Sequence, residues 1–251
     1  PMGKAKQRHR RAVEEKAAAA RQRESDYGHG HWPPLTGLRG MAAAGVLVFH
    51  VYILGGSPQA LPAPLAWLCQ CGWMGVDVFF TLSAFLLSLP FIDARERGAP
   101  APSLREYWRH RGWRILPAYW LQVAILFVLA LAGAHASYWY APNASSLAVN
   151  ALFLYDLVPF VPPPVPTWWT LPVELGFYLL LPLFARLLTP SRWWWLLVAI
   201  VASLAWRGWV RHAGFTHAQQ AAWASHLPGR LYQFLVGMLA AWALIRWRRP
   251  L

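Results

Sequence analysis

Apolar residues along this 251-residue chain gather into long stretches that short polar and basic segments separate. Each stretch has about 20 residues, the length that an α-helix needs to cross the hydrocarbon core of a bilayer. The pattern predicts six crossings, over residues 35–55, 70–92, 115–134, 168–189, 193–210 and 229–247. The expected fold class is therefore all-α, a polytopic transmembrane helix bundle.

One apolar segment, residues 147–166, does not fit this scheme. It begins LAVNALFLYDLVPF, which is short for a crossing, and five prolines between Pro159 and Pro166 break any helix that starts there. Counting it as a crossing would also move the arginines of later segments to the opposite side of the membrane. We therefore predict one short re-entrant or partial helix that lies against the bundle.

The composition agrees with a membrane setting. Charged residues make up only 13% of the chain, against about 25% in ordinary soluble domains. The net charge of +13 comes from basic blocks between apolar stretches, which is typical of cytoplasmic loops and argues against nucleic-acid binding. We expect a multi-pass protein of the inner (plasma) membrane, with residues 1–31 as a basic cytoplasmic tail and residues 32–251 as the membrane domain.

The first span contains two ionisable residues, Arg39 and His50, in LTGLRGMAAAGVLVFHVYILGG. They are 11 residues apart, which is about 1100° of helix rotation, so both side chains leave from one face. An ionisable residue inside a span is costly and by default marks function. The alternative is a hydrogen-bonded histidine that serves packing alone.

Two carboxylates are expected near His50. Counting from the outer ends of the spans places His50, Asp77 and Glu174 at a similar depth, roughly 8–9 Å at 1.5 Å per residue. Tyr178 follows Glu174 by one turn on the same face, and Ser83 lies farther along the second helix. A carboxylate beside an imidazole can fix its tautomer and stabilise the imidazolium, as a general base requires. Alternatively, Asp77 caps a helix and Glu174 pairs with an arginine for structure.

Arginines gather at the expected cytoplasmic end. Arg39 opens the first helix, and Arg111 and Arg114, in RGWR, lead into the third. Guanidinium forks bind phosphate oxygens in pairs, so this cluster suits a phosphorylated ligand. Ordinary positive loop charge explains the remaining arginines of this region, Arg95, Arg97 and Arg105.

Six segments together resemble the acyltransferase-3 family of integral-membrane acyltransferases, which includes bacterial O-acetyltransferases. They occur in family order between residues 37 and 243: LRGMAAAGVLVFH, GVDVFFTLSAFLL, RGWRILPAYW, NALFLYDLVP, WWTLPVELGFYLLLP and GRLYQFLVGMLAAW. The resemblance implies transfer of an acyl group, commonly acetyl, from coenzyme A to a hydroxyl of a carbohydrate or lipid-linked glycan of the cell envelope. No resident cofactor and no metal are expected.

The resemblance also implies roles for particular residues. The arginines would hold the nucleotide phosphates of the donor, with Ser83 and Tyr178 near the substrates. His50 would remove the acceptor proton, supported by Glu174 and Asp77. An acyl-histidine intermediate is a second route that stays open.

The chain departs from the family pattern in the segment around Glu174. The family run tryptophan–serine–leucine–serine–valine–glutamate–glutamate–glutamine reads WTLPVELG here. Glu174 keeps the first glutamate, whereas Pro172, Leu175 and Gly176 replace a serine, a glutamate and a glutamine. Family members usually have more helices, so the chain is expected to be a fragment or a shortened relative without the C-terminal helices.

Two other functions remain open at this point. In a proton-coupled transporter or flippase, His50, Asp77 and Glu174 would form a proton relay. In an inactive scaffold or partner subunit, the same residues would have no chemical role. Binding of acetyl-CoA separates the acyltransferase from both alternatives.

Overall fold

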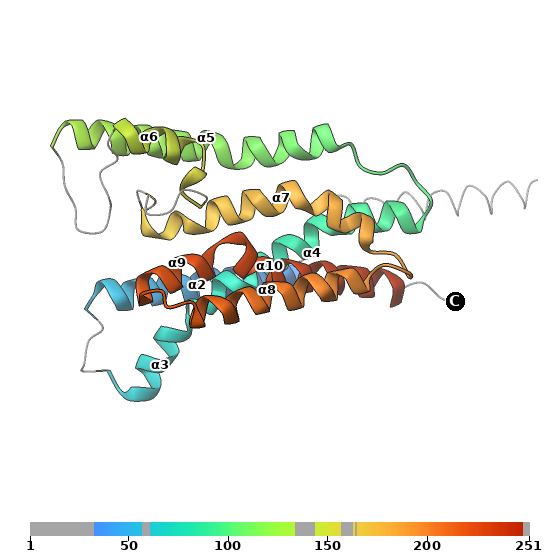
Figure 1. The fold of residues 1–251 in the computed structure, drawn as a ribbon, viewed down its shortest axis with the longest axis horizontal. Coiled ribbons are helices and arrows are strands. Elements are labelled where there is room, and N and C mark those ends of the chain that lie inside the picture. The colour runs from blue at the N-terminus through green and yellow to red at the C-terminus, as the bar shows by residue number, and fades with distance from the viewer. Residues whose placement is uncertain (1–32, 57–60, 134–143, 157–162, 164, 248–251) are drawn as a thin grey trace, which may run out of the picture. The chain divides into compact units, whose positions relative to one another are not determined.

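The computed structural model describes residues 33–56, 61–133, 144–156, 163 and 165–247, and the regular elements in these ranges are all helices (Figure 1). The all-α expectation is therefore confirmed for the described part of the chain. The α-helices are α2 (Pro33–Leu54), α3 (Ala63–Cys71), α4 (Met74–Glu96), α5 (Leu104–Leu131), α6 (Ala144–Ala151), α7 (Thr170–Leu187), α8 (Trp194–His212), α9 (His217–Ser225) and α10 (Leu227–Trp247), and the 3-10 helices are η1 (Leu154–Asp156) and η2 (Pro166–Trp169).

Several of these helices can cross a membrane. Within the described ranges, four helical segments are long and apolar enough, namely Pro34–Leu54, Ala63–Glu96, Leu104–Leu131 and Pro166–Leu187. The fifth and sixth expected crossings coincide with α8 and α10, which have 19 and 21 residues. These two helices are long enough to cross a membrane, but their mean hydropathy is lower than that of the four segments.

A short helix, α6, lies at the start of the segment for which the sequence predicts a re-entrant or partial helix. Helix α6 has eight residues and is too short to cross a bilayer. It lies along α5, because the Tyr119 hydroxyl donates to the Asn150 carbonyl at 2.7 Å and Trp120 Nε1 donates to the Ala151 carbonyl at 2.9 Å. The prolines at 159, 162 and 164 lie outside the described residues.

The chain divides into two compact units, residues 1–82 and 83–251. In the first unit, small residues let α2 pack closely against the chain around the start of α4. A Cβ atom at Gly72 would lie 2.1 Å from the Gly45 carbonyl oxygen, and one at Gly75 would lie 2.4 Å from the Ala42 carbonyl oxygen. Only glycine allows backbones to come so close.

The core of the second unit lies between α7, α8 and α10. Phe177 and Phe234 stack at 4.1 Å between ring centroids, and both are fully buried. Helices α8 and α10 are antiparallel, since Tyr232 N donates to Ser203 Oγ at 3.2 Å near one end, while Trp193 stacks on Trp242 near the other. This pairing buries the family motif GRLYQFLVG in the centre of the unit.

Arg95 joins the end of α4 to the end of α7. Its guanidinium donates to the carbonyls of Ala185 and Leu188, at 2.5 Å and 3.2 Å. These carbonyls belong to the last turn of α7, where backbone acceptors lack helical partners and a cation is favoured. Arg95 therefore has a structural role, rather than being a solvated loop charge as expected.

Candidate functional site

His50 is half-buried near the end of α2, and its ring has a defined partner. Nδ1 lies 2.7 Å from the Val46 carbonyl oxygen, one turn earlier on the same helix. Because a carbonyl only accepts hydrogen bonds, Nδ1 carries the hydrogen in this contact. The neutral ring then keeps its lone pair on Nε2, which is the tautomer that can take up a proton there.

Arg39 lies on the same helix as His50 and is also half-buried. Helix α2 runs without interruption from Pro33 to Leu54. The 11-residue spacing therefore places both residues on one face, about 16 Å apart along the axis, as the sequence predicts.

Asp77 does not lie at the level of His50. Helices α2 and α4 run in opposite directions in the first unit, and Gly75 lies against the Ala42 backbone. Asp77 is two residues beyond Gly75, so it comes near the level of Ala42, roughly 12–15 Å from His50 along the axis. The expected common depth is therefore wrong for this pair. The reason is that the helical span begins at residue 63, not 70, so Asp77 lies farther from its outer end.

In the second unit, Glu174 and Tyr178 form a pair on α7. The Tyr178 hydroxyl donates to Glu174 Oε1 across one helical turn, which confirms that they share a face. Tyr178 is 2% exposed, so its hydrogen bond holds the carboxylate in a fixed orientation inside the unit. Glu174 itself is half-buried, and a partner stabilises its carboxylate because withdrawing a charge from water is costly.

Helix α5 supplies the residues opposite this pair. The Tyr107 hydroxyl donates to the Tyr178 carbonyl at 3.2 Å, and the Arg111 guanidinium lies 5.9 Å from the centroid of the Tyr178 ring. The charges of Arg111 and Arg114 both act on the Tyr178 hydroxyl. Arg111 and Arg114 follow Tyr107 by four and seven residues, so all three lie on one face of α5. This spacing is the sequence signal that could have identified Tyr107.

The register of α5 and α7 brings the arginines to the carboxylate. The two helices are antiparallel, since Tyr107 pairs with Tyr178 while Tyr119 contacts Trp168, with ring centroids 5.1 Å apart. Arg111 is therefore level with Tyr178. We expected an arginine cluster at one end of the bundle and a separate carboxylate layer near the other. That separation is wrong for Arg111 and Glu174, because the first turns of α5 pack beside the middle of α7.

Arg111 has unused hydrogen-bonding capacity. Its Nε atom is buried and has no hydrogen-bond partner among the described residues. A buried guanidinium donor without a partner is costly unless a ligand or an ion completes it. The cluster of Arg111, Tyr178 and Glu174 thus combines an orphan cationic donor with an oriented carboxylate. Such a site can hold an anionic group beside a proton acceptor.

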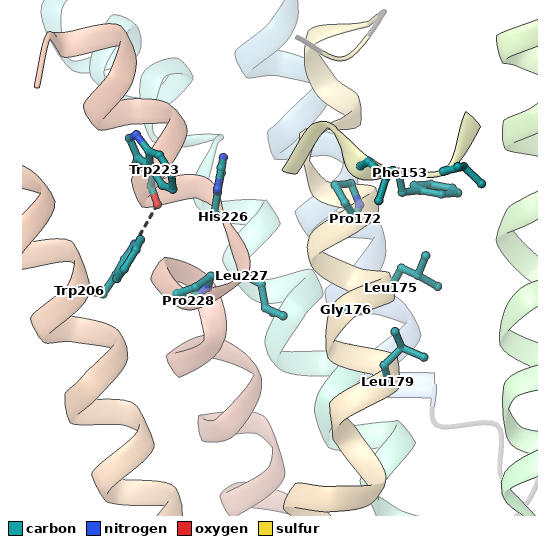
Figure 2. Close-up of a pocket in the computed structure, with 12 residues that line it drawn as sticks. Phe153, Pro172, Leu175, Gly176, Leu179, Trp206, Trp223, His226, Leu227 and Pro228 are labelled. Carbon is teal, nitrogen blue, oxygen red and sulfur yellow. Dashed lines mark hydrogen bonds between the residues drawn. The ribbon is translucent and has the colours of Figure 1, made fainter. Parts of the chain in front are cut away.

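A cavity of about 440 Å³ lies on another side of α7 (Figure 2). Apolar side chains and His226 line it, from η1, α7, α8, α9 and the start of α10. Trp206 Nε1 donates to the Trp223 carbonyl at 3.1 Å and fixes two helices at its wall. No sequence pattern predicts this cavity, because its wall is assembled from five elements. The lining residues are Leu152, Phe153, Leu154, Pro172, Leu175, Gly176, Leu179, Trp206, Trp223, His226, Leu227 and Pro228.

The eight residues that the sequence selects fall into two groups. His50, Arg39 and Asp77 belong to the first unit, and the structure separates Asp77 from His50 there. The second unit contains the others, and it brings Arg111, Glu174 and Tyr178 together, whereas Ser83 is half-buried on α4. A meeting of His50 with Glu174 stays a prediction.

These features define a class: an all-helical membrane protein with charged residues gathered between its spans. The acyltransferase-3 family model, which describes an acyltransferase domain, matches residues 33–250. The chain belongs to this family, so the assignment from six sequence motifs is confirmed.

Two relatives are O-acetyltransferases by name. Peptidoglycan O-acetyltransferase OatA of Listeria monocytogenes is 25% identical over 173 residues, which cover 64% of this chain and 25% of that protein. O-acetyltransferase OatA of Staphylococcus aureus is 27% identical over 171 residues, with 64% and 26% covered. The chain thus spans about a quarter of the length of these relatives. No solved structure matches it significantly.

Proposed function

We propose that this chain transfers an acetyl group from acetyl-CoA to a hydroxyl of a carbohydrate or a related acceptor of the cell envelope. Membership of the acyltransferase-3 family supports the reaction class, and the names of the relatives support acetyl transfer to oxygen. The observation that carries the mechanism is the contact of His50 Nδ1 with the Val46 carbonyl, because it leaves Nε2 as the basic atom.

In this mechanism His50 acts as general base. The acceptor hydroxyl oxygen attacks the thioester carbonyl carbon while Nε2 takes the hydroxyl proton. The carbon–sulfur bond then breaks, and the leaving thiolate of coenzyme A recovers the proton from the imidazolium. The base needs no carboxylate to fix its tautomer, since the helix backbone does so. Glu174 would instead stabilise the imidazolium electrostatically.

The donor would be held by arginines. Arg111 presents a buried Nε without a partner among the described residues, and Arg114 acts on the same tyrosine. Guanidinium groups suit the phosphates of a nucleotide because they bind two oxygens at once. Arg39 would contribute from the start of α2, on the face that also carries His50.

The test uses the purified full chain in detergent or nanodiscs with radiolabelled acetyl-CoA. We expect saturable binding and slow release of labelled acetate, because water replaces the missing acceptor. Addition of a sugar acceptor should give a labelled ester. A chain that neither binds nor consumes acetyl-CoA would contradict the proposal and favour a transporter or a scaffold. An acyl-histidine route would show as label that stays on the protein after rapid denaturation.

A further inference from the structure

The cavity beside α7 has the character of a hydrocarbon site. Eleven of its twelve lining side chains, all except that of His226, are apolar or belong to tryptophan or glycine. Its volume of about 440 Å³ lies within the range of roughly 300–1,000 Å³ that ligand pockets occupy. Apolar cavities stay dry and accept apolar ligands, because water finds too few polar partners in them. A sugar ring would likewise lack hydrogen-bonding groups along most of this wall.

The edge of the cavity opens on apolar surface. Leu152 and Leu179 are 63% and 60% exposed although they also line the cavity. Leu179 lies on α7, within a segment that can span a membrane, where an exposed leucine would face lipid. A chain from the bilayer can therefore enter without crossing a polar rim.

Helix α7 contributes one side of the cavity wall. Pro172, Leu175, Gly176 and Leu179 line the cavity from this helix and carry no polar side-chain group, so this side of the wall is apolar. Position 176 has no room for a larger residue without displacement of Leu227, because a Cβ atom there would lie 2.8 Å from Leu227 Cδ2.

The cavity has one polar end. His226 lies at the end where Phe153 and Pro172 also lie, whereas Leu179 lies at the opposite end (Figure 2). The His226 ring packs on Trp223, with centroids 5.0 Å apart. Pro172 is two residues from Glu174, about 3 Å along the helix axis. A polar head group at this end would thus be level with the carboxylate of the proposed site.

We propose that this cavity binds the hydrocarbon chain of an amphiphilic acyl acceptor that enters from the bilayer. The chain lies along α7 with its end toward Leu179 and its hydroxyl-bearing head toward His226. This inference rests on the proposed acetyl transfer and narrows the acceptor to a compound with a lipid tail. The apolar wall favours a hydrocarbon chain, and the single polar end at His226 favours a head group.

Binding is tested without reference to activity. The full chain in nanodiscs of dioleoylphosphatidylcholine is irradiated with dodecyl glucoside that carries a diazirine at the chain end, and labelled peptides are identified by mass spectrometry. We expect saturable labelling of peptides from the cavity wall that unlabelled dodecyl glucoside suppresses and glucose does not. Labelling that does not saturate, or that a short-chain phosphatidylcholine suppresses equally well, overturns the proposal.

Two glycine variants make the test specific. Gly176→Leu fills the cavity, so we expect its labelling to fall about tenfold, which corresponds to a loss of about 1.4 kcal/mol. Gly208→Leu is the matched control, because a Cβ atom at Gly208 meets no atom within 4 Å. If Gly176→Leu does not fold, Leu179→Trp closes the exposed edge instead, with Leu183→Trp on the same helix as its control. Equal labelling in a folded variant and its control contradicts the cavity site.

The transfer reaction then separates the two proposals. With wild-type protein we expect a KM for dodecyl glucoside at least about tenfold lower than for glucose, because hydrocarbon burial adds binding energy. Equal KM values for the two acceptors overturn the acceptor assignment while the acetyltransferase function stands. Saturable labelling without transfer to either acceptor contradicts the proposed function and leaves a hydrocarbon site.

Discussion

At the scale of single residues, a backbone carbonyl of its own helix determines which nitrogen of the His50 ring carries the hydrogen. The Val46 carbonyl, one turn earlier, lies 2.7 Å from Nδ1 and forces the hydrogen onto that nitrogen. The sequence pattern predicts an important histidine in an apolar span, but it assigns the orienting role to a carboxylate. The backbone contact could not be foreseen, because it depends on the side-chain rotamer and not on residue type.

Replacement of His50 by alanine should stop acetyl transfer. Removal of a positioned general base costs roughly 100- to 10,000-fold in rate. Expression and acetyl-CoA affinity should stay close to wild type, because the imidazole is assigned no donor contact. Steady-state transfer and equilibrium binding of labelled acetyl-CoA measure the two effects separately. Transfer at the wild-type rate would contradict the assignment of His50 as base.

Glu174→Gln should have a smaller effect than His50→Ala. Glutamine keeps the shape and can still accept a hydrogen bond from Tyr178, so only the negative charge is lost. If Glu174 stabilises an imidazolium, the rate should fall at saturating acetyl-CoA while the KM for acetyl-CoA changes little. The measurement is kcat and KM for both substrates. A change in acetyl-CoA KM alone would instead indicate a purely structural partner of Arg111.

Arg111→Ala should weaken acetyl-CoA binding. The loss of a charged hydrogen bond costs about 1.5–3 kcal/mol, which is roughly ten- to hundredfold in affinity. Arg111→Lys should restore only part of this loss, because the planar fork is missing. Isothermal titration with CoA and with dephospho-CoA locates the contact: if Arg111 binds the 3′-phosphate, the alanine variant loses affinity for CoA but not for dephospho-CoA, and if it binds the diphosphate, the variant loses affinity for both. Unchanged affinity with lost transfer would contradict the role as donor anchor.

At the scale of elements, the helices follow from the sequence but their registers do not. Apolar stretches and prolines locate α2, α5, α7 and the partial helix α6, because length and hydropathy decide whether a segment can span a membrane. The level of Asp77 depends instead on where two backbones touch at Gly75 and Ala42. Likewise, Arg111 reaches Tyr178 through the antiparallel register of α5 and α7, which no local pattern encodes.

The close contact between α2 and α4 should depend on Gly75. In Gly75→Ala the new Cβ atom would lie 2.4 Å from the Ala42 carbonyl oxygen, so one backbone must move. We expect a loss of about 1–3 kcal/mol in stability, as for other overpacked contacts. Gly40→Ala on the same helix pair meets no atom within 4 Å and should be neutral or stabilising by up to about 1 kcal/mol. Thermal unfolding in detergent compares the two, and equal midpoints would contradict the close packing.

At the scale of the whole molecule, the charge distribution determines the expected orientation. Arginines are concentrated around the junction of α4 and α5 and at the C-terminal end of α10, whereas residues 213–226 between α8 and α10 contain none. Basic loops remain on the cytoplasmic side during insertion. If α5, α7, α8 and α10 each cross once, three crossings separate the α4–α5 junction from residues 213–226, and one crossing separates those residues from the end of α10. The arginine-rich segments then lie on one side of the membrane and residues 213–226 on the other. The sequence and the helix bounds therefore support one orientation, with the N-terminus inside.

Cysteine accessibility tests this orientation directly. In a background with Cys69 and Cys71 replaced by alanine, a membrane-impermeant maleimide is added to intact spheroplasts and then to permeabilised ones. Ser103→Cys, at the exposed N-cap of α5, should react only after permeabilisation, because we place this loop in the cytoplasm. Ala218→Cys, exposed on α9, is the control and should react in both conditions. Reaction of Ser103→Cys in intact spheroplasts would place the arginine loop outside, away from cytoplasmic acetyl-CoA, and would contradict the proposed route of the donor.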